Sequence, residues 1–196
     1  ILTLFKNLKK ALIYGNGYTA ENILDLTTYL LENKINIEGI IAEKYLGLDF
    51  SKNYSKLINS EYKIEKTLIA HKLEKLKTIL ISEGEFGICT IEDIDVVSDW
   101  VYKFQIECDL DNQMILEQTR IDMEKFIHRK KLFKWSVNNQ IVSVAAINAE
   151  TDYYSKISLV YTPLEFRRKN YARSCVWSLT KMILETQPTV CLFTDK

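Results

Sequence analysis

Alternating apolar and polar residues in the last third of the chain predict a β-sheet. The runs 132–137 and 140–147 have strand periodicity and flank Asn138–Asn139, a two-residue turn of the kind that hairpins favour because asparagine accepts positive φ. Two later runs, 156–161 and 189–194, have the same character. We therefore predict a sheet that contains these four segments.

Helical spacing of apolar residues predicts three helices around this sheet, over 94–104, from Asp111 to about Ile127, and over 172–183. Thr90 with Asp93 three residues later resembles a capping box for the first helix. With a short strand at 86–90, the order becomes β-α-α-β-β-β-α-β. The positions expected to face the core are Ile94, Val97, Val101 and Phe104 in the first helix, Ile115, Ile121 and Phe126 in the second, and Ala172, Cys175, Val176, Leu179 and Ile183 in the third.

The first part of the chain predicts a separate, smaller α/β domain. The segment 64–77 fits both helix and strand periods, and pattern alone leaves that choice open. Glycine and charge interrupt the apolar pattern at 82–85, so we predict an N-terminal domain over 1–84 and a second domain over 85–196. The elements expected in the first domain are strands at 10–15 and 36–42 and helices at 20–33 and 46–58.

Composition narrows the function classes. The 196 residues are 47% hydrophobic and carry 26 basic and 26 acidic side chains, so no global charge attracts nucleic acid or an anionic membrane. No apolar run approaches the ~20 residues of a membrane span, and we expect a cytoplasmic protein. His71 and His128 have no neighbours at metal-ligand spacing, so we expect no metal. The four cysteines, expected to be reduced and mostly buried, are Cys89, Cys108, Cys175 and Cys191.

A glycine pattern near the start of the chain offers one binding hypothesis. Gly15-x-Gly17-x-x-Ala20 follows a strand and precedes a helix, which is the spacing of a dinucleotide-binding turn. Glu43 stands roughly where a ribose-binding acid would lie. An Asn-Gly turn ahead of a helix explains the same residues equally well, so a nicotinamide-dependent oxidoreductase remains an alternative.

The stretch "VYTPLEFRRKNYARSCV", residues 160–176, offers a second hypothesis. Arg167, Arg168, Lys169 and Asn170 lie between a strand end and a helix start, where backbone N–H groups have no helical partner. Such a turn attracts a phosphate, and the cations add to that attraction. Asn170 is suited to the left-handed conformation that a tight anion-binding turn needs. The other interpretation is a solvated loop with scattered basic residues.

This stretch resembles the acyl-CoA loop of the GNAT superfamily of N-acyltransferases. The family has Gln/Arg-x-x-Gly-x-Gly/Ala between its fourth strand and third helix, and here the match is Arg167-x-x-Asn170-x-Ala172. The flanking "VYTP" and "YARSCVWSLT" resemble a common bacterial form. "TIEDIDVVSDWVYKFQIE", with Trp100, Phe104 and Glu107, and "IEGIIAEKYLGLDF" resemble the branch with an extra N-terminal domain.

The resemblance implies an α+β fold: a GNAT-like mixed, mostly antiparallel sheet flanked by helices and preceded by a small α/β domain. Two residues depart from the family pattern, because Asn170 and Arg168 stand where glycine is usual. The sequence also ends at "CLFTDK", where the family continues with a helix and strands that carry an Asn and often a Tyr acid. We therefore expect the natural chain to extend beyond residue 196.

The function that the resemblance implies is transfer of an acetyl group from acetyl-CoA to a primary amine, on a small molecule or a peptide. Glu107 is the candidate base or acceptor contact, with Asp109 and Asp111 nearby in sequence. A non-catalytic acyl-CoA-binding or regulatory module is the alternative, and a homodimer is a further expectation. The residues expected to bind acetyl-CoA are Val160, Tyr161, Thr162, Arg167, Arg168, Lys169, Asn170, Tyr171, Ala172 and Arg173.

Overall fold

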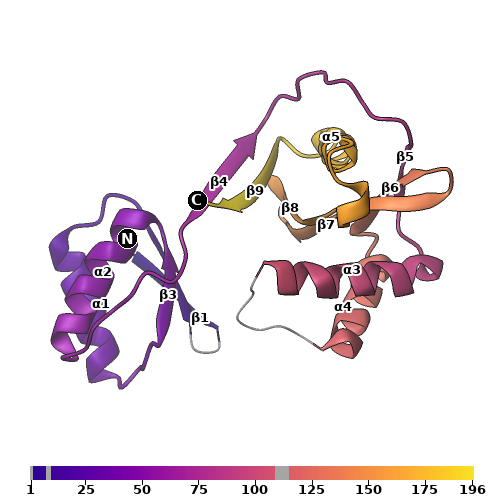
Figure 1. Cartoon of the computed structure of the whole chain (residues 1–196). Helices are drawn as coiled ribbons and strands as arrows, with labels where there is room; N and C mark the ends of the chain where they lie inside the picture. The colour runs from indigo at the N-terminus through magenta and orange to yellow at the C-terminus, as the bar shows by residue number, and fades with distance from the viewer. Residues whose placement is uncertain (1, 8–9, 109–114) are drawn as a thin grey trace. The chain divides into compact units, whose positions relative to one another are not determined.

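The computed structural model describes residues 2–7, 10–108 and 115–196 of the chain (Figure 1). The chain divides into two compact units, Ile1–Thr67 and Leu68–Lys196.

The first unit is a three-stranded sheet with two helices. Its strands are β1 (Leu2–Asn7), β2 (Lys10–Gly15) and β3 (Gly39–Ala42), in the order β1-β2-β3. β2 and β3 are parallel and joined through α1 (Ala20–Glu32), whereas β1 pairs antiparallel with β2; α2 (Lys44–Leu57) follows β3. The predicted strands and helices of this region are confirmed, and β1 was not predicted.

The core of the first unit lies between the sheet and its two helices. Ala11 and Ile13 alternate with exposed neighbours on β2, so one face of that strand is buried. Burying a large aliphatic or aromatic side chain completely contributes about 1.5–3 kcal/mol. The helix residues that complete this core are Ile23, Leu30, Leu46, Phe50 and Tyr54.

The second unit is built on a six-stranded sheet in the order β4-β9-β8-β7-β6-β5. Every neighbouring pair is antiparallel except β8 and β9, which are parallel. This confirms the predicted mixed, mostly antiparallel sheet and the predicted element order. The strands are β4 (Leu68–Leu73), β5 (Glu85–Ile88), β6 (Leu132–Val137), β7 (Gln140–Glu150), β8 (Tyr154–Tyr161) and β9 (Thr189–Asp195), and the helices are α3 (Ile94–Glu107), α4 (Leu116–His128) and α5 (Tyr171–Leu184).

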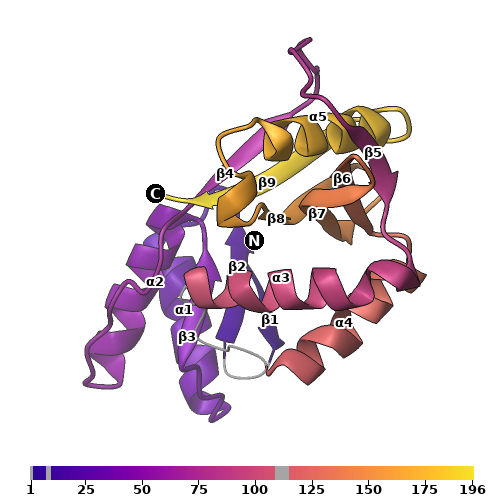
Figure 2. The ribbon, with the colours of Figure 1, turned by 45° about the vertical axis from the view of Figure 1, so that its right-hand side comes forward.

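Helices cover both faces of this sheet, with α3 and α4 on one face and α5 on the other (Figures 1 and 2). Side-chain alternation along the strands sorts the core into two layers. Leu132 and Val144 pack with α3 and α4, whereas their chain neighbours Phe133 and Ala145 pack with α5. Asn138 and Asn139 form the predicted hairpin turn, with φ of 49° and 61°. The sheet therefore packs against α5, with Phe133 and Ala145 of the strands in one cluster with Cys175 of the helix.

The predicted inward face of α4 is wrong at Ile115 and Ile121 but confirmed at Phe126, which is partly buried against the core, whereas that of α3 is largely confirmed. Ile115 and Ile121 are 68% and 43% exposed, and the buried residues of α4 are Thr119, Met123 and Ile127. The reason is a polar contact in the helix interface, since Gln105 Nε2 on α3 donates to Thr119 Oγ1 at 3.0 Å. A pattern of apolar residues alone misses a face that contains threonine. Asp111, expected to cap this helix, lies outside the described residues.

Strand β4 settles the open choice for the segment 64–77. It pairs antiparallel with β9 from Leu68–Asp195 to Leu73–Val190, so it covers one edge of the last strand. All six β4 residues are exposed, so no burial alternation marks it as a strand. Residues 68–73 therefore belong to the sheet of the second unit.

The segment between β4 and β5, residues 74–84, crosses over α5, and we call it the strap (Figure 1). Its last residues pack on β6, because Trp135 Nε1 donates to the Glu83 carbonyl at 3.0 Å. Gly84, at φ +124°, leaves no room for a side chain, since a Cβ there would lie 2.5 Å from Trp135 and from Ser136. The two compact units therefore divide between residues 67 and 68, and not at the predicted boundary of 84/85. Gly84 is not part of a linker between domains, because it packs closely against β6.

Candidate functional site

The two parallel strands β8 and β9 form a fork. Among the described residues they pair only over Tyr154–Lys156 and Thr189–Cys191. Beyond this point β8 continues beside β7 and β9 continues beside β4. One edge of β8 from residue 157 to 161 is thereby released from its neighbour, and its backbone groups can meet a ligand.

The far end of β8 is fixed from its other side by Ser143 of β7. Ser143 Oγ donates to the Tyr161 carbonyl at 3.2 Å and accepts from Thr162 Oγ1 at 2.9 Å. Leu159 has φ of 50°, and the β7–β8 register shifts nearby. A strand irregularity of this kind bends the strand and increases its twist. Ser143 is completely buried and was not predicted, because nothing in the run "SVAAI" marks it.

The turn after β8 contains two residues in the left-handed conformation. Arg168 and Asn170 both have φ of 62°, with Lys169 between them. Left-handed backbone costs a residue other than glycine roughly 1–2 kcal/mol, somewhat less for asparagine. The left-handed conformation predicted for Asn170 is confirmed. Arg168, the other residue that stands where GNAT sequences usually have glycine, has the same conformation. The sequence thus reproduces the backbone of a glycine-rich turn without its glycines.

The start of α5 is open to an anion. Asn170 occupies the N-cap position, yet its side chain makes no capping hydrogen bond. In contrast, the N-cap Thr19 of α1 accepts from the Asn22 N–H at 3.3 Å. The first N–H groups of a helix carry partial positive charge and point outward, which favours a phosphate when no side chain caps them. Tyr171 and Ala172, the first residues of α5, are half-buried here.

Cations and a cavity surround this helix start. Arg168, Lys169 and Arg173 are exposed, as the predicted phosphate contacts need to be. A cavity of about 330 Å³ lies beside them, between strap residues 80–83 and residues 169–171 and Arg173. Of the residues predicted to bind phosphate, Lys169, Asn170, Tyr171 and Arg173 line this cavity, and the acidic Glu83 lines it from the strap.

Arg167 does not point into this group of cations. Its guanidinium Nε donates to the Thr162 carbonyl at 2.8 Å, and its NH2 group donates to Glu107 Oε2 at 2.5 Å. It also lies over the Tyr161 ring, 5.8 Å from the centroid. Arg167 was expected near the phosphates, and instead it ties the turn to the end of β8 and to α3, because a carboxylate lies within reach on that side.

Glu107 comes from the last turn of α3, on a helix face that holds Tyr161. Trp100, Phe104 and Glu107 are spaced four and three residues apart, so they share one face. The rings of Trp100 and Phe104 meet the Tyr161 ring edge-on, at 6.3 Å and 6.2 Å between centroids. The Tyr161 hydroxyl donates to Glu107 Oε1 at 2.7 Å. Both oxygens of Glu107 are therefore engaged, one by Tyr161 and one by Arg167.

These contacts shift the pKa of both acids. The hydrogen bonds from Arg167 and then from Tyr161 lower the pKa of Glu107 below its ordinary value. Burial, and then the hydrogen bond to Glu107, raises the pKa of Tyr161 to about 12. A carboxylate with a lowered pKa is a weak proton acceptor. The geometry thus fits Glu107 better as a residue that positions Arg167 than as a base, while Asp109 and Asp111 lie outside the described residues.

The glycine signal of the first unit has a structural explanation. Glu43 is the N-cap of α2, and its carboxylate accepts from the Tyr45 and Leu46 N–H groups at 2.9 and 3.2 Å. Gly17 has φ of 62° with open space around it, as a turn residue before a helix requires. A helix cap and a turn account for the residues that suggested a dinucleotide site.

Within the described residues, no group of three or more His, Cys, Asp and Glu side chains could hold a metal ion. No helix there is long and apolar enough to cross a membrane. Cys89 and Cys175 are buried, and Cys191 is half-buried, whereas Cys108 is exposed; all four are reduced. Burial raises the pKa of Cys175 to about 12, so this thiol is not a nucleophile.

No protein-family model and no curated protein sequence matches this chain. Solved structures do. An acetyltransferase from the GNAT family of Colwellia psychrerythraea superimposes with a TM-score of 0.65 over 96% of this chain and 68% of its own, at 12% identity. The fold is that of a GNAT acetyltransferase. Two other structures match shorter parts of this chain. A predicted acetyltransferase with acetyl-CoA from Clostridium acetobutylicum matches with a TM-score of 0.48 and 19% identity, over 57% of this chain and 81% of its own. Ribosomal-protein-alanine N-acetyltransferase from Brucella melitensis matches with a TM-score of 0.43 and 17% identity, over 53% of this chain and 69% of its own.

The GNAT-like fold explains why the fork and the basic turn adjoin each other. At 12% identity the likeness concerns the fold alone, so the function of this chain rests on its own residues. The released edge of β8, the left-handed turn and the uncapped start of α5 are consecutive in the sequence, from residue 157 to Ala172.

Proposed function

We propose that the protein is an N-acetyltransferase that transfers an acetyl group from acetyl-CoA to a primary amine. The observation that carries the proposal is the turn at Arg168–Asn170, whose two left-handed residues precede a helix start without a side-chain cap. A glycine-type turn built from residues other than glycine costs conformational energy, and such cost is typical of binding sites.

The residues of the turn and of the β8 end divide the work of binding. The N–H groups from Arg168 to Ala172 and the cations Lys169 and Arg173 are suited to the phosphates of CoA. The free edge of β8, with Val160, Tyr161 and Thr162, is suited to the polar pantetheine arm and to the thioester. Acetyl-CoA supplies the activated acetyl group, and these residues bind and orient it.

The acceptor is proposed to be an amine of a small molecule or a peptide. A primary amine is protonated at neutral pH, so a base must take its proton before transfer. Glu107 was the candidate, and its engagement by Arg167 and Tyr161 leaves it poorly placed for that task. Within the described residues, Glu107 therefore serves the proposal as a positioning residue.

The hydrogen bonds that engage Glu107 favour a second candidate function, a module that binds acyl-CoA without turnover. A binding module needs the turn and the strand edge but needs no base. The engaged Glu107 is what this candidate explains and the enzyme proposal does not.

Thioester turnover separates the two functions. The protein is incubated with acetyl-CoA and a panel of amines that includes polyamines, amino acids and peptides with free N-termini, and release of free CoA thiol is followed. The enzyme proposal expects release that depends on one class of amine and falls in the Asn170→Val variant. Tight acetyl-CoA binding with no amine-dependent release would establish the binding module instead.

A further inference from the structure

Ser82 of the strap forms a hydrogen bond with the turn. Ser82 Oγ donates to the carbonyl of Lys169 at 2.9 Å, although the two residues are 87 positions apart. The Ser82 N–H donates to Ser174 Oγ at 2.9 Å, and Ser174 is completely buried in the first turn of α5. Ser82 therefore bridges both sides of the helix start, the turn before it and the first helical turn.

The position of this bond within the turn is informative. Lys169 is the residue between Arg168 and Asn170, the two residues with φ of 62°. Because the peptide group is planar and trans, fixing the Lys169 carbonyl also fixes the opposite direction of the Asn170 N–H. One hydrogen bond thus orients the peptide group at the centre of the proposed phosphate-binding turn.

Strain explains why the turn needs an external partner. Residues in unfavourable backbone conformations persist only where the surrounding structure holds them. Glycines at both positions would adopt positive φ at no steric cost. Here the side chains at 168 and 170 raise that cost, and Ser82 supplies a compensating bond.

We infer that Ser82 is a positioning residue for acetyl-CoA binding, which it serves by holding the Lys169–Asn170 peptide group in its left-handed turn. The inference rests on the proposed function, because it concerns the same turn. It extends the site to the strap, a segment far from the motif in sequence. Ser82 also lies in the wall of the cavity beside residues 169–171, so the strap and the turn face the same space.

The test compares Ser82→Ala, which removes the hydroxyl, with Ser82→Thr, which keeps it. Ser82→Ala is expected to raise the dissociation constant and the KM for acetyl-CoA about 3- to 10-fold, the effect of one net hydrogen bond. The kcat is expected to stay unchanged, because Ser82 contacts no reacting atom. Ser82→Thr is expected to restore the affinity to within about twofold.

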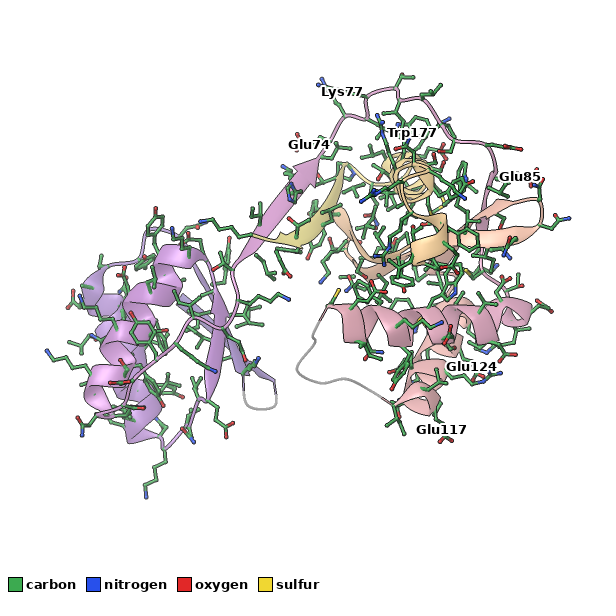
Figure 3. All side chains as sticks on the ribbon, viewed as in Figure 1. Glu74, Lys77, Glu85, Glu117, Glu124 and Trp177 are labelled. Atoms are coloured by element: carbon green, nitrogen blue, oxygen red, sulfur yellow. The ribbon has the colours of Figure 1, made fainter. Side chains whose placement is uncertain are left out.

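A matched control removes a different tie of the strap. Trp177 Nε1 donates to the Lys77 carbonyl at 2.8 Å, a contact between α5 and the strap that does not involve the turn (Figure 3). Trp177→Phe is expected to leave acetyl-CoA affinity unchanged. If it weakens binding as much as Ser82→Ala does, the strap acts as a whole and the specific role of Ser82 is refuted.

A second readout separates this inference from the proposed function. Amide hydrogen exchange of the peptide that covers 167–172 is measured without ligand, and exchange is expected to be faster in Ser82→Ala than in the unsubstituted protein or Trp177→Phe. If the unsubstituted protein binds acetyl-CoA but Ser82→Ala matches it in affinity and exchange, the inference fails and the proposed function stands. If the unsubstituted protein does not bind acetyl-CoA, the proposed function fails. In that case faster exchange in Ser82→Ala still supports the inference that Ser82 holds the Lys169–Asn170 peptide group. Unchanged exchange in Ser82→Ala overturns that inference.

Discussion

The carboxylate of Glu107 accepts a hydrogen bond from the guanidinium of Arg167 at 2.5 Å and so joins α3 to the proposed acetyl-CoA turn. Each partner also reaches the end of β8, Glu107 through the Tyr161 hydroxyl and Arg167 through the Thr162 carbonyl. The pair therefore closes a ring of contacts around the strand end. In this arrangement Glu107 ties Arg167, at the start of the turn, to the last turn of α3.

Replacing Glu107 tests positioning against base catalysis. Glu107→Gln keeps the shape and a hydrogen bond to Tyr161 but removes the charge, so acetyl-CoA affinity is expected to fall about 2- to 5-fold, as for a partly exposed ion pair. The pH profile of kcat/KM is expected to keep its shape, because the removed group is not the base. In the Arg167→Ala background, Glu107→Gln is expected to add little further loss. Disappearance of an ionisation from the profile would restore Glu107 as the base.

The pair also predicts how stability depends on pH. Because the pKa of Glu107 is lowered in the folded state, its contribution is present above the unfolded value of about 4.3 and is lost as pH falls through the folded value. The melting temperature of the unsubstituted protein is therefore expected to exceed that of Glu107→Gln by a constant margin from pH 9 to pH 5. The margin should shrink only in more acidic buffer, since Arg167 stays charged throughout. A margin that instead vanishes between pH 6 and pH 8 would contradict the lowered pKa.

Substitutions at Asn170 test the left-handed turn. Asn170→Gly is expected to keep or improve acetyl-CoA affinity, because glycine adopts φ near 62° freely. Asn170→Val is expected to lose about 5- to 150-fold, since strain of a β-branched residue at positive φ costs roughly 1–3 kcal/mol. Calorimetric titration measures both, with melting temperatures to confirm folding. Equal affinity of the Val variant would show that ligand binding does not use this conformation.

Arg168 offers a prediction about stability alone. Its φ of 62° is strained for a long side chain, so Arg168→Gly is expected to stabilise the fold by up to about 1 kcal/mol. Arg173 is the matched control, because it is also exposed and basic but lies in the first turn of α5. Arg173→Gly is expected to destabilise by roughly 0.5–1 kcal/mol, the cost of glycine in a helix. Urea unfolding measures both, and destabilisation by both variants would argue against strain at 168.

Local features of the site could be predicted from the sequence because short-range physics sets them. Asn138–Asn139 and Asn170 are marked by the tolerance of asparagine for positive φ, and all three adopt it. The capping role of Asp93 follows from its spacing to Thr90, whose N–H it accepts at 2.8 Å. The strands of the second unit could be located from their apolar runs, although β7 is buried at six consecutive residues, 142–147, because helices cover both faces of the sheet.

The contacts that give the site its shape could not be predicted in this way. Glu107 and Arg167 are 60 positions apart, and Ser82 and Lys169 are 87 apart, so no local pattern links them. Strand β4 has no buried residue, and its place in the sheet comes entirely from pairing with β9. The buried side of α4 includes Thr119, whose burial depends on a partner, Gln105, in another helix.

Calorimetric titration of the unsubstituted protein and of Asn170→Val, each with acetyl-CoA and with NADH, tests the central claim most directly. The account predicts that acetyl-CoA binds the unsubstituted protein, that Asn170→Val weakens this binding although the variant still unfolds in one cooperative transition, and that NADH binds neither. Tight binding of NADH with no binding of acetyl-CoA would contradict the account and return the glycine turn of residues 15–20 as the ligand site.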